Sequence, residues 1–263
     1  MIFEALQTEW TDFDFIYAKG FTPWCLLEKK KKGIHMGPIG IKFHGYEMFQ
    51  KAAGLKSKLE QQMLKPPVVF INRHADLIFS YGGNITDLIA STGVDRRKVV
   101  EIGSGIDDEW LLTAPIPTRG RRKLLFIGRN EKRKGIDDLL ELHSMLTSSN
   151  IEFHWVGPLP KNKRIDAPNM IYHGEITDTQ KLQSIIDNCD VLVAPSHSEG
   201  MPNVILEAMA RGLAIIATRV GAVPVMVSDQ NGRLISPNNR KALREALNEM
   251  IHMPDSAIFE LKR

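Results

Sequence analysis

The sequence predicts an α/β fold built on parallel sheets and divided into two domains. Short apolar and β-branched runs alternate with helical patterns at intervals of roughly 20 residues, which is typical of βαβ units. The chain has 263 residues, 43% hydrophobic and 25% charged, and this suits two globular domains. A stretch without periodicity contains Pro115, Pro117 and Gly120. We therefore expect a domain boundary between residues 117 and 118.

Ten strands are expected from runs of five or six mostly apolar residues next to turn-forming residues. Their apolar composition suits strands that are covered on both faces. They span residues 14–18, 39–44, 76–80, 98–102, 123–128, 152–157, 170–174, 191–195, 214–218 and 232–236.

Helices are expected between these strands. Proline fits the first turn of a helix, where its missing N–H is no loss, so the segment after Pro66 and Pro67 is expected to begin a helix. Residues 82–93 suit a helix that Gly93 ends. Residues 135–146 have the apolar spacing of a single amphipathic helix.

Net charge, cysteine spacing and hydropathy indicate which partners and which cellular compartment to expect. The net charge of +3 is mild, so we expect no nucleic-acid partner. The two cysteines, Cys25 and Cys189, lie far apart and lack metal-site spacing, which favours a reducing, cytoplasmic compartment. No signal peptide and no apolar run of about eighteen residues is present, so we expect no membrane-spanning segment.

A turn and a helix start after the strand at 191–195 carry the strongest functional signal. Glu199 and Glu207 stand on either side of the letters Gly-Met-Pro-Asn, with Pro202 expected as the first helical residue and Gly212 as the stop. The free N–H groups of a helix start form an anion site. Because carboxylates would repel an anion, we infer a ligand with hydroxyl groups on both sides of a phosphate, such as a nucleotide sugar. The alternative is that both acids are ordinary surface residues.

Basic residues follow the strand at 123–128. Arg129 comes directly after this strand, and Lys134 precedes the glycine that begins the next helix. At the carboxyl end of a parallel strand, both side chains would reach a diphosphate held at the switch point of the sheet. A solvated basic face is the alternative.

These residues resemble the GT-B glycosyltransferases, specifically glycosyltransferase family 4, whose members use nucleotide-diphospho sugars. The resemblance rests on "GRNEKRKG", on "VLVAPSHSEGMPNVILEAMARGLAIIATRVGAVPVMV" and on "NGRLISP", and it covers residues 123–250. It implies two Rossmann-like doubly wound parallel-sheet domains, with an acceptor-side domain at 1–117 and a donor-binding domain at 118–263. Relatives begin with a strand and a glycine-rich loop, whereas this chain opens on letters that resemble a later unit. We therefore expect the first domain to be incomplete.

The resemblance also implies roles for single residues. Glu207 would bind the ribose hydroxyls, and Glu199 would lie beside the transferred sugar as a catalytic residue. His44 resembles the histidine that the first domain presents to the reacting sugar, although a structural histidine is the alternative. Arg129 and Lys134 match the diphosphate-binding cations. The other donor-binding candidates are Gly200, Met201, Pro202, Asn203 and Val204, which would contact sugar hydroxyls and phosphate, and Ile176, which would wall the nucleobase pocket.

The implied activity is transfer of a glycosyl group, with retention, from a UDP- or GDP-linked sugar to an acceptor hydroxyl in polysaccharide, lipopolysaccharide or glycolipid synthesis. The acceptor would be a carbohydrate or a lipid-linked molecule. Because cations and a helix start would stabilise the departing diphosphate, we expect no metal and no other cofactor. Three alternatives stay open: a GT-B sugar-nucleotide epimerase, a phosphorylase, and a catalytically inactive nucleotide-sugar-binding fragment or partner subunit.

Lysine-rich segments suggest a membrane surface as a separate hypothesis. The run "EKKKKG" and the segment 45–65, with Lys51, Lys56, Lys58 and Lys65, would form a basic amphipathic surface near anionic lipid. Solvated helix faces are the alternative. Under the first interpretation the chain is cytoplasmic and in peripheral contact with the inner membrane face.

Overall fold

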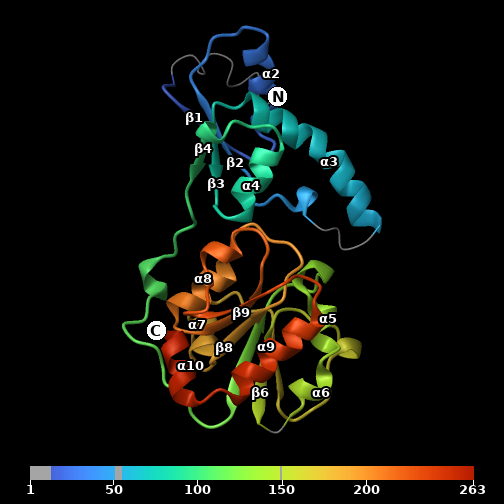
Figure 1. Ribbon diagram of the computed structural model, residues 1–263, viewed down its shortest axis with the longest axis vertical. Coiled ribbons are helices and arrows are strands. Elements are labelled where there is room, and N and C mark those ends of the chain that lie inside the picture. The colour runs from blue at the N-terminus through green and yellow to red at the C-terminus, as the bar shows by residue number, and fades with distance from the viewer. Residues whose placement is uncertain (1–12, 51–54, 149) are drawn as a thin grey trace. The chain divides into compact units, whose positions relative to one another are not determined.

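The computed structural model describes residues 13–50, 55–148 and 150–263, which form two compact units with one parallel sheet each (Figure 1). Of these described residues, the first unit comprises 13–50 and 55–104 with 199–201, and the second comprises 105–148, 150–198 and 202–263. All ten predicted strands are confirmed, with ends shifted by at most two residues. They are β1 (Ile16–Lys19), β2 (Ile39–Lys42), β3 (Leu77–Ser80), β4 (Val99–Glu101), β5 (Arg122–Ile127), β6 (Ile151–Val156), β7 (Met170–Gly174), β8 (Val191–Ala194), β9 (Ala214–Thr218) and β10 (Gly232–Ile235).

Helices and short 3-10 turns connect the strands, as βαβ units require. The predicted stop of the helix at 82–93 is confirmed, since Gly93 follows it with a φ of +82°. The helices are α2 (Trp24–Lys31), α3 (Leu55–His74), α4 (Asn84–Ser91), α5 (Ile136–Leu140), α6 (His143–Leu146), α7 (Thr179–Asp187), α8 (Asn203–Ala210), α9 (Arg240–His252) and α10 (Asp255–Lys262), and the 3-10 turns are η2 (Glu47–Phe49), η3 (Arg96–Lys98), η4 (Asp108–Trp110), η5 (Lys132–Lys134), η6 (Lys161–Lys163) and η7 (Val223–Val225).

The sheet of the first unit has the order β1-β2-β3-β4, and all its pairs are parallel. Ile41 of β2 lies opposite Ile78 of β3, and both side chains are fully buried. Helix α3 corrects a prediction, because Pro66 and Pro67 lie inside it rather than before it. A proline inside a helix costs about 3 kcal/mol, because one backbone hydrogen bond is lost and the ring clashes with the carbonyl group of the preceding turn. Burial of residues beyond the prolines, such as Ile71, offsets this cost.

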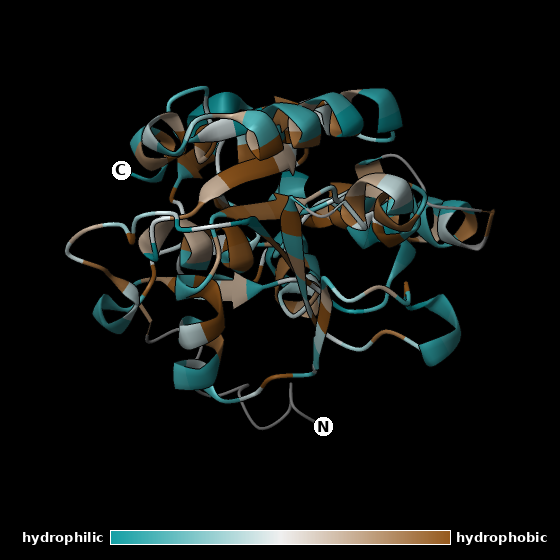
Figure 2. Ribbon diagram, turned by 90° about the horizontal axis from the view of Figure 1, so that it is seen from below, coloured by the Kyte–Doolittle hydropathy of each residue, from teal (hydrophilic) through white to brown (hydrophobic). Residues whose placement is uncertain are grey.

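The sheet of the second unit has the order β10-β9-β8-β5-β6-β7 and is parallel throughout. Its apolar cluster includes Leu124, Trp155 and Val191 from the strands and residues of α5, α6, α9 and α10. The buried residues of α7 and α8 lie outside this cluster, against the alternate side chains of the strands. Figure 2 shows strands that are mostly hydrophobic beneath helices with hydrophilic outer faces. The second unit is therefore a doubly wound, Rossmann-like sheet.

The prediction of one continuous helix at 135–146 is wrong, although the segment is largely helical. Two short helices, α5 and α6, share this segment. Leu142 leaves helical geometry, with φ −90° and ψ 21°, and yet its side chain is 2% exposed. The break keeps Leu139, Leu142 and Leu146 in the same core.

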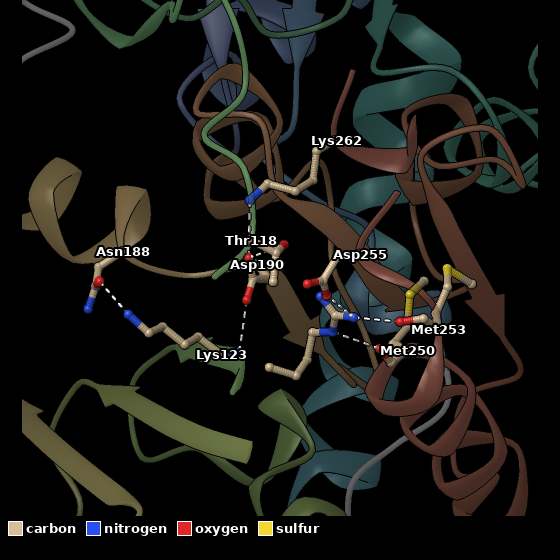
Figure 3. Close-up of polar contacts among 9 residues, drawn as sticks. Thr118, Lys123, Asn188, Asp190, Met250, Met253, Asp255 and Lys262 are labelled. Atoms are coloured by element: carbon tan, nitrogen blue, oxygen red, sulfur yellow. Dashed lines mark hydrogen bonds and ion pairs between the residues drawn. The ribbon is translucent and has the colours of Figure 1, made fainter. Parts of the chain in front are cut away.

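Asp190 joins distant segments at the amino end of the second sheet (Figure 3). Its Oδ1 accepts hydrogen bonds from Thr118 Oγ1 at 2.6 Å and from Lys262 Nζ at 3.2 Å. Its Oδ2 accepts the backbone N–H of Lys123 at 2.9 Å. Because the side chains of Asp190 and Lys262 are 6% and 2% exposed, this is a buried, hydrogen-bonded ion pair.

Arg122 at the start of β5 makes a second buried connection, and its partners Met250, Met253 and Asp255 are labelled in Figure 3. Its Nε donates to the carbonyl oxygen of Met250 at 3.0 Å, and a terminal nitrogen donates to that of Met253 at 2.6 Å. The same nitrogen lies 3.1 Å from Asp255. These bonds hold the end of α9 and the start of α10 against β5.

Candidate functional site

The order of the second sheet reverses between β5 and β8. In open parallel sheets, ligands bind outside the carboxyl ends of the strands at such a switch point. The segments that leave this point are residues 128–135 after β5 and residues 195–202 after β8. Most of the predicted donor-binding residues lie in these two loops and at the start of α8.

The two loops contact each other. Gly135 has a left-handed φ of +71°, and a Cβ atom there would lie 2.0 Å from the carbonyl oxygen of Pro195. The backbone N–H of His197 donates to the carbonyl oxygen of Arg133 at 2.6 Å. Both the conformation and the close approach require glycine at position 135.

A buried carboxylate braces the loop after β8. Asp138, in the first turn of α5, accepts hydrogen bonds from His197 Nε2 at 2.6 Å and from Arg240 Nε at 2.6 Å. Burial by itself raises the pKa of Asp138. The bonds from Arg240 and His197 outweigh this effect, so the pKa lies below its usual value. Asp138 therefore remains ionised and holds an imidazole two residues before Glu199.

The predicted cations lie on the loop after β5. Arg129 is 72% exposed in its side chain and pairs with Glu131 at 3.0 Å. Glu131 also pairs with Arg133 at 2.6 Å. Lys134 is the last residue of η5, next to the glycine that precedes α5. Glu131 is thus the counter-ion of Arg129 in this structure, and a bound diphosphate would compete with it.

Helix α8 begins one residue later than predicted. Pro202 is extended, with φ −75° and ψ 115°, so it precedes the helix instead of forming its first residue. Gly212 follows the helix with a φ of +68°, as predicted. The backbone N–H groups of Asn203 and Val204 stand at the helix N-terminus, where the positive end of the dipole favours an anion.

The two predicted glutamates have different surroundings. Glu199 is 7% exposed and is followed by Gly200 and Met201, and this three-residue segment groups with the first unit. Glu207 lies one turn into α8 and is half-buried. Burial raises the pKa of its carboxyl group. Among the residues that the structure describes, none forms an ion pair or hydrogen bond with this carboxylate.

Glu207 lines a cavity of about 140 Å³ in the second unit. One wall is formed by residues 105–107 and Trp110, and the other by Asn203, Leu206 and Glu207. Asp107 in the first wall and Asn203 in the second also carry hydrogen-bonding side chains. An unpaired carboxylate beside a polar cavity suits a ligand with hydroxyl groups, because their protons would satisfy its oxygens. No sequence pattern had singled out Trp110.

His44 and Ile176 each follow the carboxyl end of a strand. His44 is exposed after β2 in the first unit, between the buried residues Phe43 and Tyr46. The hydroxyl of Tyr46 donates to Asn72 Oδ1 at 3.2 Å, which anchors the loop. Ile176 is half-buried two residues beyond β7 in the second unit. Their roles stay predictions.

Two histidines lie side by side near this edge of the sheet: His154 in β6 and His173 in β7. His173 occupies the extra position of a β-bulge, and its Nε2 lies 2.9 Å from Nδ1 of His154. The Nε2 of His154 lies 2.8 Å from Glu152 Oε1. Burial lowers the pKa of both histidines, and repulsion by His154 lowers that of His173 further. No spacing pattern in the sequence marks this cluster.

Among residues 13–50, 55–148 and 150–263, no group of three or more His, Cys, Asp or Glu side chains is arranged to hold a metal ion. None of the helices in this part of the chain has the length and apolar character to cross a membrane. Metal independence stays a prediction. Of the lysines in the membrane hypothesis, Lys51 lies outside the described residues.

Several curated relatives resemble this chain in sequence. It is 32% identical over 133 residues to the putative teichuronic acid biosynthesis glycosyltransferase TuaC of Bacillus subtilis, covering 50% of this chain and 33% of that protein. It is 33% identical over 164 residues to the uncharacterized glycosyltransferase MJ1178 of Methanocaldococcus jannaschii, covering 60% and 45%. It is 21% identical over 235 residues to the putative colanic acid biosynthesis glycosyltransferase WcaL of Escherichia coli, covering 83% and 56%. The chain thus spans between a third and just over half of these relatives.

Solved structures share the fold across nearly the whole chain. A sucrose-phosphate synthase from Thermosynechococcus elongatus matches with a TM-score of 0.76 at 18% identity, covering 99% of this chain and 69% of that one. The lipopolysaccharide outer core galactosyltransferase WaaB, in its apo form, matches with a TM-score of 0.72 at 19% identity, covering 99% and 72%. Anabaena Alr3699/HepE, solved in complex with UDP, matches with a TM-score of 0.70 at 19% identity, covering 98% and 74%. At these identities the likeness establishes the fold of two Rossmann-like domains.

A family model also matches, over residues 121–253, which is just over half of the 263 residues. Its span runs from the start of β5 to the end of α9 and contains both loops of the switch point. The chain therefore belongs to the family described as glycosyl transferases group 1.

Proposed function

We propose that the chain transfers a glycosyl group, with retention, from a UDP- or GDP-linked sugar to a carbohydrate or lipid-linked acceptor in polysaccharide, lipopolysaccharide or glycolipid synthesis. One observation carries this proposal: the loops after β5 and β8 contact each other at the switch point, beside the N-terminus of α8. The relatives named for teichuronic acid and colanic acid biosynthesis support the polysaccharide class. The UDP complex of Alr3699/HepE supports a nucleotide donor.

The reaction breaks the bond between the anomeric carbon of the donor and its diphosphate oxygen. A new bond forms between that carbon and the acceptor oxygen, and the acceptor's proton passes to the leaving diphosphate. Negative charge accumulates on the leaving diphosphate. Arg129, Lys134 and the backbone N–H groups at 203–204 would stabilise it, and each donor is worth about 3 kcal/mol by comparison with oxyanion sites. The proposal needs no metal ion.

The remaining candidates would orient the donor. Glu207, unpaired beside its cavity, would accept the hydrogen bonds of the ribose hydroxyls, and its desolvation would then be compensated. Glu199 would lie beside the transferred sugar, with Gly200 and Met201 contributing backbone contacts. His44 would contact the reacting sugar, and Ile176 would wall the base. A cytoplasmic location with peripheral contact at the inner membrane face belongs to the same proposal.

Titration calorimetry with UDP and GDP tests the donor site. We expect Lys134→Ala and Glu207→Ala each to weaken binding of one nucleotide by roughly thirtyfold, about 2 kcal/mol. The exposed pair of α9 supplies matched controls, Lys241→Ala and Glu245→Ala, which should leave the affinity unchanged. Equal affinity in all four variants would reject the donor-site assignment. Affinity without any turnover of UDP- or GDP-sugars would instead favour an inactive nucleotide-binding protein.

Product analysis tests the reaction itself. Nuclear magnetic resonance of the product should show the same anomeric configuration as the donor, and inversion would refute retention. Turnover should survive EDTA. Reversible loss of activity on chelation would refute metal independence.

A further inference from the structure

We infer that a cavity at the amino end of the second sheet binds a small phosphorylated sugar. The cavity has a volume of about 340 Å³, and small-molecule sites occupy roughly 300–1,000 Å³. Its walls come from the segment before β5, the start of β5, the end of α7, the residues that lead into β8 and the last residue of α10. All of these segments belong to the second unit.

This cavity is separate from the donor site at the switch point. It lies before strands β5 and β8, whereas the loops of the donor site follow the same strands. Strand β5 has six residues, which corresponds to about 20 Å of extended chain between the two places. None of the residues that line the cavity is a candidate donor-binding or catalytic residue. The inference therefore goes beyond glycosyl transfer.

The two acids of the cavity are already neutralised by cations. Asp190 pairs with Lys262 at 3.2 Å, and both side chains are buried. Asp187 pairs with Arg211, whose Nε donates to Oδ1 at 2.7 Å. Any further cation at the cavity therefore adds a positive charge that these carboxylates do not balance.

Two further cations line the cavity. Arg119 is exposed and forms no ion pair or hydrogen bond within residues 13–50, 55–148 and 150–263. The ammonium of Lys123 donates to the side-chain oxygen of Asn188 at 2.6 Å, and Figure 3 shows it extended from β5 toward that residue. A guanidinium has five N–H groups and an ammonium has three, so most of these donors stay available. A phosphate group accepts several such charge-assisted hydrogen bonds at once.

Lys262 adds a buried donor to the same cavity. Its side chain is only 2% exposed and yet contributes to the cavity wall. Its ammonium donates to Asp190 and to no other residue that the structure describes, so two of its three N–H groups lack a protein acceptor. Buried donors without partners are costly. An oxygen of a bound phosphate would satisfy them.

Hydrogen-bond acceptors and apolar groups lie beside the cations. The carboxylate oxygens of Asp187 can each accept a second hydrogen bond, and Asn188 is the C-cap of α7, where backbone carbonyl groups lack helical partners. Hydroxyl groups of a ligand would donate to these oxygens. Ile116 and Pro117 supply apolar surface for the C–H groups of a sugar ring. Phosphate on the cations and hydroxyl groups on the acceptors together describe a sugar monophosphate.

Titration calorimetry of the full chain tests this site. The probes are glucose 6-phosphate, glucose 1-phosphate and fructose 6-phosphate, and we expect one bound molecule per chain for at least one of them. Arg119→Gln and Lys123→Gln should each weaken that binding by about tenfold, because each removes a charged donor. The double variant Lys241→Gln with Arg244→Gln, at exposed positions of α9, is the matched control and should bind as the parent does. Thermal unfolding confirms that each variant is folded.

Two comparisons separate this site from the donor site. The affinity for the sugar phosphate should be the same with and without UDP, and Lys134→Ala should leave it unchanged. Failure of the donor-site assignment would therefore not alter this result. Inorganic phosphate should bind about tenfold more weakly than the sugar phosphate, because it makes no hydroxyl contacts.

Four outcomes would overturn the proposal. They are no binding of any of the three sugar phosphates at millimolar concentration, unchanged affinity of both Arg119→Gln and Lys123→Gln, displacement of the sugar phosphate by UDP, and equal affinity for inorganic phosphate. The last result would show a site for simple anions only.

Discussion

The imidazole of His197 donates a hydrogen bond of 2.6 Å to the carboxylate of Asp138 and so joins the loop after β8 to the first turn of α5. Arg240 donates to the other oxygen of the same carboxylate from the start of α9. Three separate elements thereby determine the course of the chain just before Glu199. A loop held by side chains from neighbouring elements is preorganised, so less conformational freedom is lost when a ligand binds.

We predict that Asp138→Asn lowers the free energy of unfolding by about 2 kcal/mol at pH 7, because an amide cannot accept two charge-assisted hydrogen bonds. Urea denaturation measures this difference. The pKa of Asp138 is lowered, so its contribution exists above the usual aspartate pKa and is lost as the pH falls through the lowered value. The difference from the parent should therefore vanish in acid. Asp166→Asn, an exposed control, should change little, and equal stability of parent and Asp138→Asn at pH 7 would contradict the bracing role.

Glu207→Gln should stabilise the chain in the absence of nucleotide, by about 1 kcal/mol at pH 7, because an unpaired, half-buried charge is removed. The raised pKa has a defined sign: the contribution of Glu207 to stability declines as the pH rises from the usual glutamate pKa to the raised one. Thermal unfolding with and without UDP measures both effects. The variant should also lose most of the stabilisation by UDP. A less stable variant, or one with an undiminished shift by UDP, would count against the role of Glu207, and Glu245→Gln is the exposed control.

The His154–His173 pair should make stability depend on pH near neutrality. Both pKa values lie below the ordinary 6.5, mainly through burial, although Glu152 partly opposes this for His154. The unfolded chain therefore binds more protons than the folded one below pH 6.5, and stability should fall as the pH is lowered. His173→Asn should weaken this dependence in urea titrations between about pH 7.5 and 5. The exposed His35→Asn should keep it, and an unchanged slope in His173→Asn would refute the assignment.

Replacing only one partner of the buried Lys262–Asp190 ion pair should lower the free energy of unfolding strongly. Lys262→Met leaves the Asp190 carboxylate buried without its cation, so we expect a loss of roughly 3–5 kcal/mol. The double variant Lys262→Met with Asp190→Asn should recover part of the loss, because the amide oxygen can still accept from Thr118. Urea denaturation of the four members of this cycle gives the coupling energy. Additive losses would show that the two side chains do not interact energetically.

The strands were predictable because their signal is local. A run such as Leu124–Ile127 has to be buried on both faces of a parallel sheet, and its apolar composition alone predicts a buried strand. The segment 191–212, with its strand, turn, helix and glycine stop, was predictable for the same reason, as were the positions of Glu199 and Glu207 on it. Helix boundaries depend less on local sequence alone. Pro66 and Pro67 are local signals for a helix start, but burial of later residues such as Ile71 overrides them.

The bracing contacts could not be predicted in the same way. Asp138 is 59 positions from His197 and 102 positions from Arg240, and no periodicity connects them. The partnership of Asp190 with Lys262 spans 72 positions. Each depends on which helix covers which part of the sheet.

By itself, the sequence determined the alternation of strands and helices, the turn that opens α8 and the placement of two acids around it. These features follow from residue preferences and from spacing between residues that are close in sequence. Only the tertiary structure decided that Glu131 neutralises Arg129, that Glu207 remains unpaired beside a cavity, and that Leu55, Leu59 and Met63 point to solvent. The physical reason is that burial and pairing depend on neighbours brought together by folding, and their identity is not encoded in any local pattern.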